Sequence, residues 1–294
     1  MDVIASTIVA ALASEILFER DPELFGTLDD AARTKRCVFV AGLPGVGKSL
    51  AVQQLALIAA AAGRTVHVLQ WDVARRPFDR PSVLARYPEE DGVTDPAIRA
   101  AVGLWARQAV GRWQEAHAGP HDVLVGETPL IGNRLMSLAR PMDDDAETLL
   151  ASTETIFLIA VPKAAVRAAV AAARERDSAA PRHERERASA APHLVRSHWT
   201  ELVEIARRLG ARVPEPTPEY DSDIYLTVYR RALRHRSALA LLIRTVLPIR
   251  VSAQELPGAR ELVPNDDEVT RFIAKIERVP REAIERAAAL WYDV

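Results

Sequence analysis

The sequence predicts a three-layer α/β fold, in which a mostly parallel sheet is flanked by helices and carries a helical lid. Residues Cys37–Ala41 are a short apolar run, residues 42–47 are rich in glycine, and residues 49–62 are rich in helix formers. Gly63 ends that helix, and Thr65–Gln70 is a second apolar run. This order of strand, loop, helix and strand is typical of a unit whose two strands lie parallel.

The composition is that of a packed protein with one domain. Hydrophobic residues make up 49% of the 294 residues and charged residues 27%, a balance that disordered chains and coiled coils do not share. We expect one domain over residues 1–294, with a lid insertion at residues 174–192 and a helical C-terminal extension from about residue 262. The formal net charge of −2 gives no overall field that would attract nucleic acid or an anionic membrane, so neither is expected as a partner.

The N-terminal segment and the cysteine content favour a cytoplasmic protein. Residues 1–18 are apolar, but Asp2 replaces the basic start of a signal sequence and Glu15 interrupts the run, so a buried helix is expected. No stretch reaches the roughly 18 uncharged apolar residues that would suggest a membrane span. Cys37 is the only cysteine and lies in a predicted strand, which favours a buried, unreactive thiol.

The rest of the chain continues to alternate between strands and helices. Further strands are expected at residues 123–125, 156–161 and 238–247. A helix should begin after Asp95 and run to about residue 116, and another should reach residue 277 from a cap at Asp266 or Asp267. The remaining helices are expected at residues 164–173, 199–209, 221–235 and 281–291. Residues 75–90, rich in proline and arginine, should be irregular and lie above the edge of the sheet.

A phosphate-binding motif lies between the first strand and the helix that follows it. Residues 42–49, with the sequence GLPGVGKS, match G-x-x-x-x-G-K-[ST] in the strand–loop–helix context that the motif requires. Glycines let backbone N–H groups curl around phosphates, and the helix amino terminus favours an anion. Lys48 should reach the β- and γ-phosphates, and Ser49 should offer its hydroxyl to magnesium. A glycine turn that only caps a helix would leave these two side chains unexplained.

The motif resembles that of the P-loop NTPases, which implies ATP and Mg²⁺ as cofactors. The residues expected to bind the nucleotide are Gly42, Leu43, Pro44, Gly45, Val46, Gly47, Lys48, Ser49 and Leu50. A GTPase would carry an Asn-Lys-x-Asp motif, but residues 161–164 read VPKA. A motor or AAA-type ATPase would end its third strand on paired acidic residues, whereas residues 123–128 contain one. The chain is more similar to small-molecule and nucleoside kinases, over about residues 37–209, although only the P-loop is specific by itself.

Two carboxylates are the expected partners of the P-loop. Asp72 closes the second strand, where the resemblance implies a base that takes a proton from a substrate hydroxyl. Glu127 follows the third apolar run, much as an acidic residue does in uridine and pantothenate kinase-like proteins, and should hold magnesium through water. Their roles can be exchanged, so the expected metal ligands are Ser49, Glu127 and Asp72. The alternatives are a turn-capping aspartate and a surface glutamate.

Arginines from two segments complete the expected site. Residues 174–187 form a charged lobe broken by proline, and the resemblance implies a lid whose Arg174, Arg182 and Arg185 neutralise charge on the transferring phosphoryl group. A solvated helix face is the alternative. Beside Asp72, a second set would line the acceptor pocket: Trp71 as an apolar wall, and Arg75 and Arg76 as forks for an anionic group. A tryptophan packed at the sheet edge beside exposed arginines is the alternative there.

These features predict an ATP- and Mg²⁺-dependent phosphotransferase acting on a small-molecule acceptor, such as a nucleoside, nucleotide, sugar or alcohol. One alternative is a switch resembling the signal-recognition and metallochaperone GTPases, because residues 66–75 also fit their strand ending in Asp with a nearby Arg. Another is an ATP-binding regulatory module, for which the unmatched C-terminal third leaves room. Transfer to an acceptor, hydrolysis alone and binding without turnover would distinguish the three.

Overall fold

The centre of the structure, a computed structural model that describes residues 16–179, 192–247, 256 and 258–294, is a parallel sheet of six strands. Their order across the sheet is β5-β4-β1-β3-β2-β6. The strands are β1 (Cys37–Ala41), β2 (Thr65–Gln70), β3 (Asp122–Thr128), β4 (Thr155–Pro162), β5 (Ala238–Ile243) and β6 (Arg260–Glu261). Because all six run in the same direction, their carboxyl ends meet at one edge, where side chains from separate segments converge.

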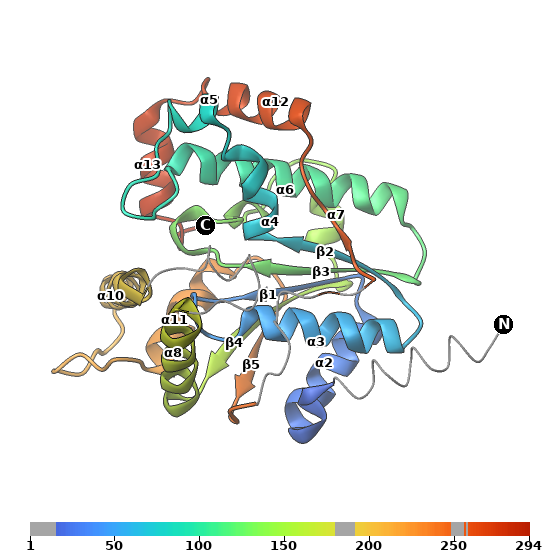
Figure 1. Cartoon of the computed structure of the whole chain (residues 1–294), viewed down its shortest axis with the longest axis vertical. Coiled ribbons are helices and arrows are strands. Elements are labelled where there is room, and N and C mark those ends of the chain that lie inside the picture. Colours follow the sequence, from blue (N-terminus) through green and yellow to red (C-terminus); the bar gives the residue numbers. More distant parts are fainter. Residues whose placement is uncertain (1–15, 180–191, 248–255, 257) are drawn as a thin grey trace.

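Helices cover both faces of this sheet (Figure 1). On one side lie α6 (Pro96–Ala116), α12 (Asp266–Ile276) and α13 (Arg281–Ala289), and on the other lie α2 (Pro22–Thr34) and α3 (Lys48–Ala61). Three further helices are α8 (Ala164–Ala179), α10 (Pro192–Arg208) and α11 (Ser222–Ala232). Short helical turns are η1 (Leu17–Arg20), α4 (Trp71–Arg75), η2 (Arg76–Phe78), α5 (Pro81–Leu84), η3 (Ile131–Asn133), η4 (Met136–Leu138) and α7 (Glu147–Leu150). Within the described residues, no helix combines the length and apolar character needed to cross a membrane.

The core lies between the sheet and these helices. Every residue of β1 is buried, as expected for a parallel strand that is covered on both faces and therefore reads as one apolar run. The alanine-rich α3 also lacks a polar face, because it packs between α2 and strands β1 to β3. Cys37 is buried, and burial raises the pKa of its thiol to about 12, so the expectation of an unreactive cysteine is confirmed.

The first part of the chain follows the predicted order with two corrections. The second strand ends at Gln70, and Trp71 and Asp72 open helix α4 instead of closing the strand. Residues 75–90 were expected to be irregular, but they include η2 and α5, each with a proline in its first turn. Proline suits that position because its φ angle is already helical and its missing N–H is not needed there.

The C-terminal part contains one strand that the pattern did not predict and one cap that it misassigned. Strand β6 has only two residues, too few for an alternating pattern, and pairs with His67 and Val68 of β2. Helix α12 is capped by Asn265 rather than by Asp266 or Asp267. The Asn265 side chain accepts from the Glu268 N–H at 2.9 Å, and the Glu268 carboxylate accepts from the Asn265 N–H at 3.0 Å.

Two predictions fall partly outside the described residues. The helix expected near the amino terminus lies mostly in residues 1–15, which are outside them, and residues 17–20 form the turn η1. In the expected lid, the backbone of α8 continues through residue 174 to Ala179, and α10 begins at Pro192. The first part of that segment is therefore a continuation of α8, and residues 180–191 lie outside the described part of the chain.

Candidate functional site

The glycine-rich segment 42–49 turns sharply between β1 and α3 at the carboxyl edge of the sheet. Gly42, Gly45 and Gly47 have φ angles of 152°, 81° and 93°, a region that side-chain-bearing residues rarely adopt. A Cβ atom on Gly42 would also lie 2.8 Å from Cγ2 of Val46 and would collide with the Tyr225 hydroxyl. Gly47 is the N-cap of α3 and brings no side chain to cap it, so the first N–H groups of this helix are arranged as in an anion-binding site.

Lys48 and Ser49, at the start of α3, both contact Glu127. The Lys48 ammonium is buried, donates a hydrogen bond of 2.9 Å to the carbonyl oxygen of Leu43 and lies 3.3 Å from Oε1 of Glu127. The Ser49 hydroxyl donates to Oε2 of Glu127 at 2.9 Å. Glu127 lies inside β3 rather than after the strand, and the parallel register pairs it with Val40 of β1. With no strand between β1 and β3, the three predicted side chains come together directly.

Asp72 belongs to the same electrostatic cluster. It lies in the first turn of α4, two residues after Gln70, which the register pairs with Glu127. Burial and, after it, the neighbouring Glu127 carboxylate raise the pKa of Asp72 to about 6 against the opposing charge of Arg75. The carboxyl group is therefore mostly ionised at pH 7 to 8 and has a basicity suited to accepting a proton.

The residues expected to line an acceptor pocket are placed differently. The Trp71 ring is buried, with the guanidinium of Arg134 5.9 Å from its centroid. Arg75 donates to Asp79 at 2.9 Å, and Arg76 is exposed. This arrangement matches the alternative of a tryptophan packed at the sheet edge, and these three residues line neither of the two pockets described below.

Arg134 was not singled out from the sequence, although the structure places it beside the site. It lies in the loop after β3, where Leu130, Asn133 and Leu135 have φ angles of 63°, 71° and 57°. Left-handed conformations are rare for residues other than glycine, and buried examples concentrate at functional sites. Only Asn133 is a residue type that tolerates this conformation well, so the sequence carries almost no signal for the loop.

Helix α11 supports this loop and the glycine-rich segment from below. The Tyr225 and Tyr229 rings stack with centroids 4.7 Å apart, and both residues are fully buried. The Tyr229 hydroxyl donates to the Pro129 carbonyl at 2.9 Å, while the Tyr225 hydroxyl lies against Gly42. The aromatic pair thereby connects the two loops to each other.

The structure does not describe the side chains of the predicted lid arginines. Arg182 and Arg185 lie outside the described residues, and of Arg174 only the backbone in α8 is described.

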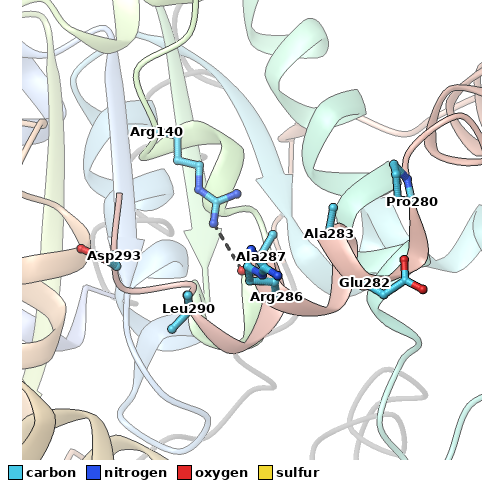
Figure 2. Close-up of a pocket in the computed structure, with 8 residues that line it drawn as sticks. All are labelled: Arg140, Pro280, Glu282, Ala283, Arg286, Ala287, Leu290 and Asp293. Carbon is cyan, nitrogen blue, oxygen red and sulfur yellow. Dashed lines mark hydrogen bonds between the residues drawn. The ribbon is translucent and has the colours of Figure 1, made fainter.

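Two pockets lie on the α13 side of the molecule. The first, of about 430 Å³, lies between Arg140 and α13 and shares no residue with segment 42–49, Asp72 or Glu127 (Figure 2). Arg140 donates to the Ala287 carbonyl at 3.3 Å on its wall. The second, of about 380 Å³, is lined by Arg134, whose charge acts on Asp72, although neither Asp72 nor Glu127 lines it. The second pocket is the better candidate for binding an acceptor, although it is smaller, because only its lining includes a residue that interacts with the site.

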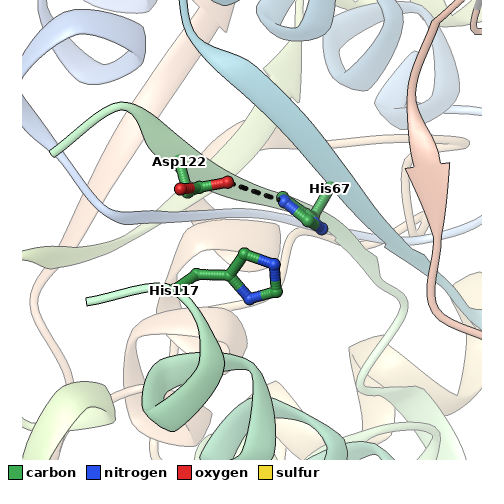
Figure 3. A group of neighbouring side chains, drawn as sticks. All are labelled: His67, His117 and Asp122. Atoms are coloured by element: carbon green, nitrogen blue, oxygen red, sulfur yellow. Dashed lines mark hydrogen bonds and ion pairs between the residues drawn. The ribbon is translucent and has the colours of Figure 1, made fainter. Parts of the chain in front are cut away.

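A separate group of potential metal ligands lies toward the amino ends of β2 and β3 (Figure 3). Ligand atoms of His67, His117 and Asp122 lie within 4.8 Å of one another, and their types suit zinc. His67 Nε2 is 2.9 Å from Oδ1 of Asp122, and His117 Nδ1 is 3.1 Å from the Trp113 carbonyl oxygen. Burial lowers the pKa of His67, so its imidazole is neutral at pH 7. These hydrogen bonds explain the cluster as a polar contact between the end of α6 and the sheet, which needs no metal ion.

No protein-family model, curated protein or solved structure matches this chain. The contacts among segment 42–49, Asp72 and Glu127 are therefore the basis for a functional proposal.

Proposed function

We propose that this chain is a phosphotransferase that uses ATP and Mg²⁺ to phosphorylate a small-molecule acceptor. The observation that carries the proposal is the convergence of Lys48, Ser49 and Glu127 at the start of α3, with Asp72 coupled to the same carboxylate. An ordinary cluster of charged surface residues would not explain why a buried lysine, left-handed glycines and a helix start without a side-chain cap occur together here.

The residues present fit a nucleotide and a magnesium ion. Segment 42–49 offers backbone N–H groups and the amino terminus of α3 to phosphate oxygens, and Lys48 adds a positive charge at the same end of the helix. Ser49 and Glu127 supply two hard oxygen donors in contact with each other, which is the donor type that Mg²⁺ prefers. ATP brings the transferable phosphoryl group, and Mg²⁺ neutralises its charge.

Asp72 is the group that would activate the acceptor. Its raised pKa lets it take a proton from a hydroxyl group near neutral pH, and its position beyond the end of β2 separates it from the contact between Ser49 and Glu127. We therefore assign the metal to Glu127 and the base to Asp72. A second observation favours transfer over hydrolysis: a pocket that could hold a small acceptor is lined by Arg134, whose charge interacts with that of Asp72.

Incubation with γ-labelled ATP and pools of nucleosides, sugars, alcohols and their phosphates tests the proposal. We expect magnesium-dependent transfer of label to one pool, with label in inorganic phosphate remaining minor. Lys48→Ala should abolish transfer, while Lys35→Ala, which changes the half-buried lysine that follows α2 and bonds the Thr153 carbonyl, should not. Release of labelled phosphate with every pool would indicate a hydrolase, and ATP binding without any turnover would indicate a regulatory module; either result would contradict the proposal.

A further inference from the structure

The pocket beside the site is built around two buried arginines. It lies between the start of α6, the loop after β3, α10 and α13, and its polar lining consists mainly of Arg99, Arg134, His198, Glu201 and Glu285. Its volume of about 380 Å³ is within the range of pockets for small molecules. Both arginines are more than nine-tenths buried, with 9% and 8% of their surface exposed.

Both guanidinium groups lie close to Gly132. Arg99 Nη1 donates to the Gly132 carbonyl at 2.7 Å, and a Cβ atom placed on Gly132 would collide with this nitrogen and lie 3.4 Å from Nη1 of Arg134. Burial lowers the pKa of Arg99 to about 10, and the positive charge of Arg134 contributes to the same effect. Holding two like charges in a buried position is unfavourable unless an anion offsets them.

Neither arginine has a carboxylate partner among the described residues. Their hydrogen bonds go to carbonyl oxygens, of Gly132 for Arg99 and of Ile131 for Arg134, and Nε of Arg99 has no partner within that part of the chain. The two pocket glutamates hydrogen-bond other groups, although the charge of Glu201 acts on both arginines from a distance and offsets part of theirs. Glu201 accepts from the Trp291 indole at 3.1 Å, and Glu285 accepts from Arg281 at 2.7 Å.

Two other buried arginines of the chain have the carboxylate partner that Arg99 and Arg134 lack among the described residues. Arg107 and Arg236 are equally inaccessible, and both bind the carboxylate of Glu147, Arg236 through two hydrogen bonds of 2.8 and 2.9 Å. Buried charges are ordinarily compensated in this way. Arg99 and Arg134 keep donors available at a pocket instead, and a pair of guanidinium forks suits a planar or tetrahedral oxyanion.

We propose that Arg99 and Arg134 bind a phosphate or carboxylate group of the acceptor, so that the substrate of the reaction is an anionic small molecule. This inference rests on the proposed function. Arg134 connects the pocket to the reactive groups, because its charge lowers the pKa of Asp72 and its guanidinium lies 5.9 Å from the Trp71 ring centroid. An acceptor anchored there would present its remaining groups toward Asp72, and the anchor would offset two buried charges that Glu201 offsets only in part.

The anion site can be tested without ATP or turnover. Segment 42–49 would itself bind phosphate, so the experiment uses the Lys48→Ala protein and titrates it calorimetrically with inorganic phosphate and, separately, with malonate at constant ionic strength. We expect at least one of the two anions to bind, and the preferred one identifies the group as phosphate or carboxylate. Adding Arg99→Gln or Arg134→Gln should weaken that binding about 10-fold or more, the scale of a lost charge-assisted contact. Arg33→Gln, at an exposed pair on α2, is the matched control.

Thermal unfolding of the same proteins guards against variants that lose binding by unfolding. Arg134→Met removes one of two buried like charges that no carboxylate contacts among the described residues, so its melting temperature should be unchanged or higher, whereas Arg107→Met should lower it because Glu147 loses a partner. The proposal is overturned if neither anion binds, or if folded Arg99→Gln and Arg134→Gln proteins bind as tightly as the control. Loss of anion binding with phosphoryl transfer retained would reject only this inference, and anion binding without any transfer would reject only the proposed function.

Discussion

The Ser49 hydroxyl donates a 2.9 Å hydrogen bond to Oε2 of Glu127, a residue 78 positions further along the chain. The contact joins the first turn of α3 to the end of β3, and Lys48 lies 3.3 Å from the other oxygen of the same carboxylate. Both oxygens of Glu127 therefore face the glycine-rich segment. The same geometry would serve a magnesium ion held between the hydroxyl and the carboxylate.

We predict that Ser49→Ala and Glu127→Gln each raise the magnesium concentration needed for half-maximal turnover by about 10-fold or more, because each removes an oxygen from the proposed metal site. Ser49→Thr keeps the hydroxyl and should behave like the natural protein. Turnover measured across a magnesium titration checks this. An unchanged magnesium requirement in both the Ala and the Gln variants would contradict the assignment.

Lys48→Ala should abolish turnover and weaken ATP binding strongly, since the proposed role of this ammonium is to contact the phosphates. Lys35→Ala removes a half-buried lysine that donates to the Thr153 carbonyl, so it should leave ATP binding unchanged. Calorimetric titration with ATP compares the two proteins. Equal ATP affinity in a folded Lys48→Ala protein and in the control would remove the central element of the proposed function.

Asp72→Asn should lower turnover about 100-fold or more while stabilising the fold at alkaline pH. The folded-state pKa of about 6 lies above the ordinary value of 3.8, so the contribution of Asp72 to stability is fully present below pH 3.8 and is lost as the pH rises through about 6. The neutral amide escapes this loss, which is worth on the order of 3 kcal/mol at pH 8.

Two measurements check the Asp72 prediction. Urea denaturation at pH 8 and pH 4 should show the stabilisation by Asp72→Asn at the higher pH only, and Asp143→Asn, at an exposed aspartate, should show it at neither. In the natural protein, kcat/KM should fall on the acid side with an apparent pKa near 6. A variant that is no more stable at pH 8, together with activity that does not change between pH 5 and pH 8, would rule out the base.

Glu147→Gln should destabilise the fold by about 3 kcal/mol, because it removes the carboxylate shared by the buried guanidinium groups of Arg107 and Arg236. Of the two, Arg107 keeps its contact with Asp144. Burial opposes ionisation of Glu147, but hydrogen bonds from these two arginines outweigh it and lower its pKa to about 2. The stabilisation is thus present above the ordinary pKa of 4.5 and is lost as the pH falls through about 2.

Chemical denaturation at pH 7 and at successively lower pH values tests this. The difference between the natural protein and Glu147→Gln should shrink below pH 4.5. Glu154→Gln, which changes an exposed carboxylate 3.7 Å from Arg36, should cost less than about 1 kcal/mol. Similar small effects for the two glutamine variants would show that the buried network is not important for stability.

The sequence by itself determined the part of the site that is local in the chain. Strand β1, the turn at residues 42–47 and helix α3 follow one another without a gap. The apolar run, the spacing of the glycines and the helix-forming residues are therefore enough to predict them. Lys48 and Ser49 were placed correctly for the same reason. Residues 155–162 likewise formed the expected strand, because a fully buried parallel strand is a continuous apolar run.

Tertiary structure alone decided which distant side chains meet that local unit. The strand order places β3 beside β1, and this adjacency brings Glu127 within hydrogen-bonding distance of Ser49. The pocket arginines come from α6 and from a loop with left-handed non-glycine residues, and neither element has a sequence pattern that points to a ligand. Burial, like-charge proximity and the lack of a carboxylate partner depend on distances in space between segments far apart in the chain, and a linear pattern contains no measure of those distances.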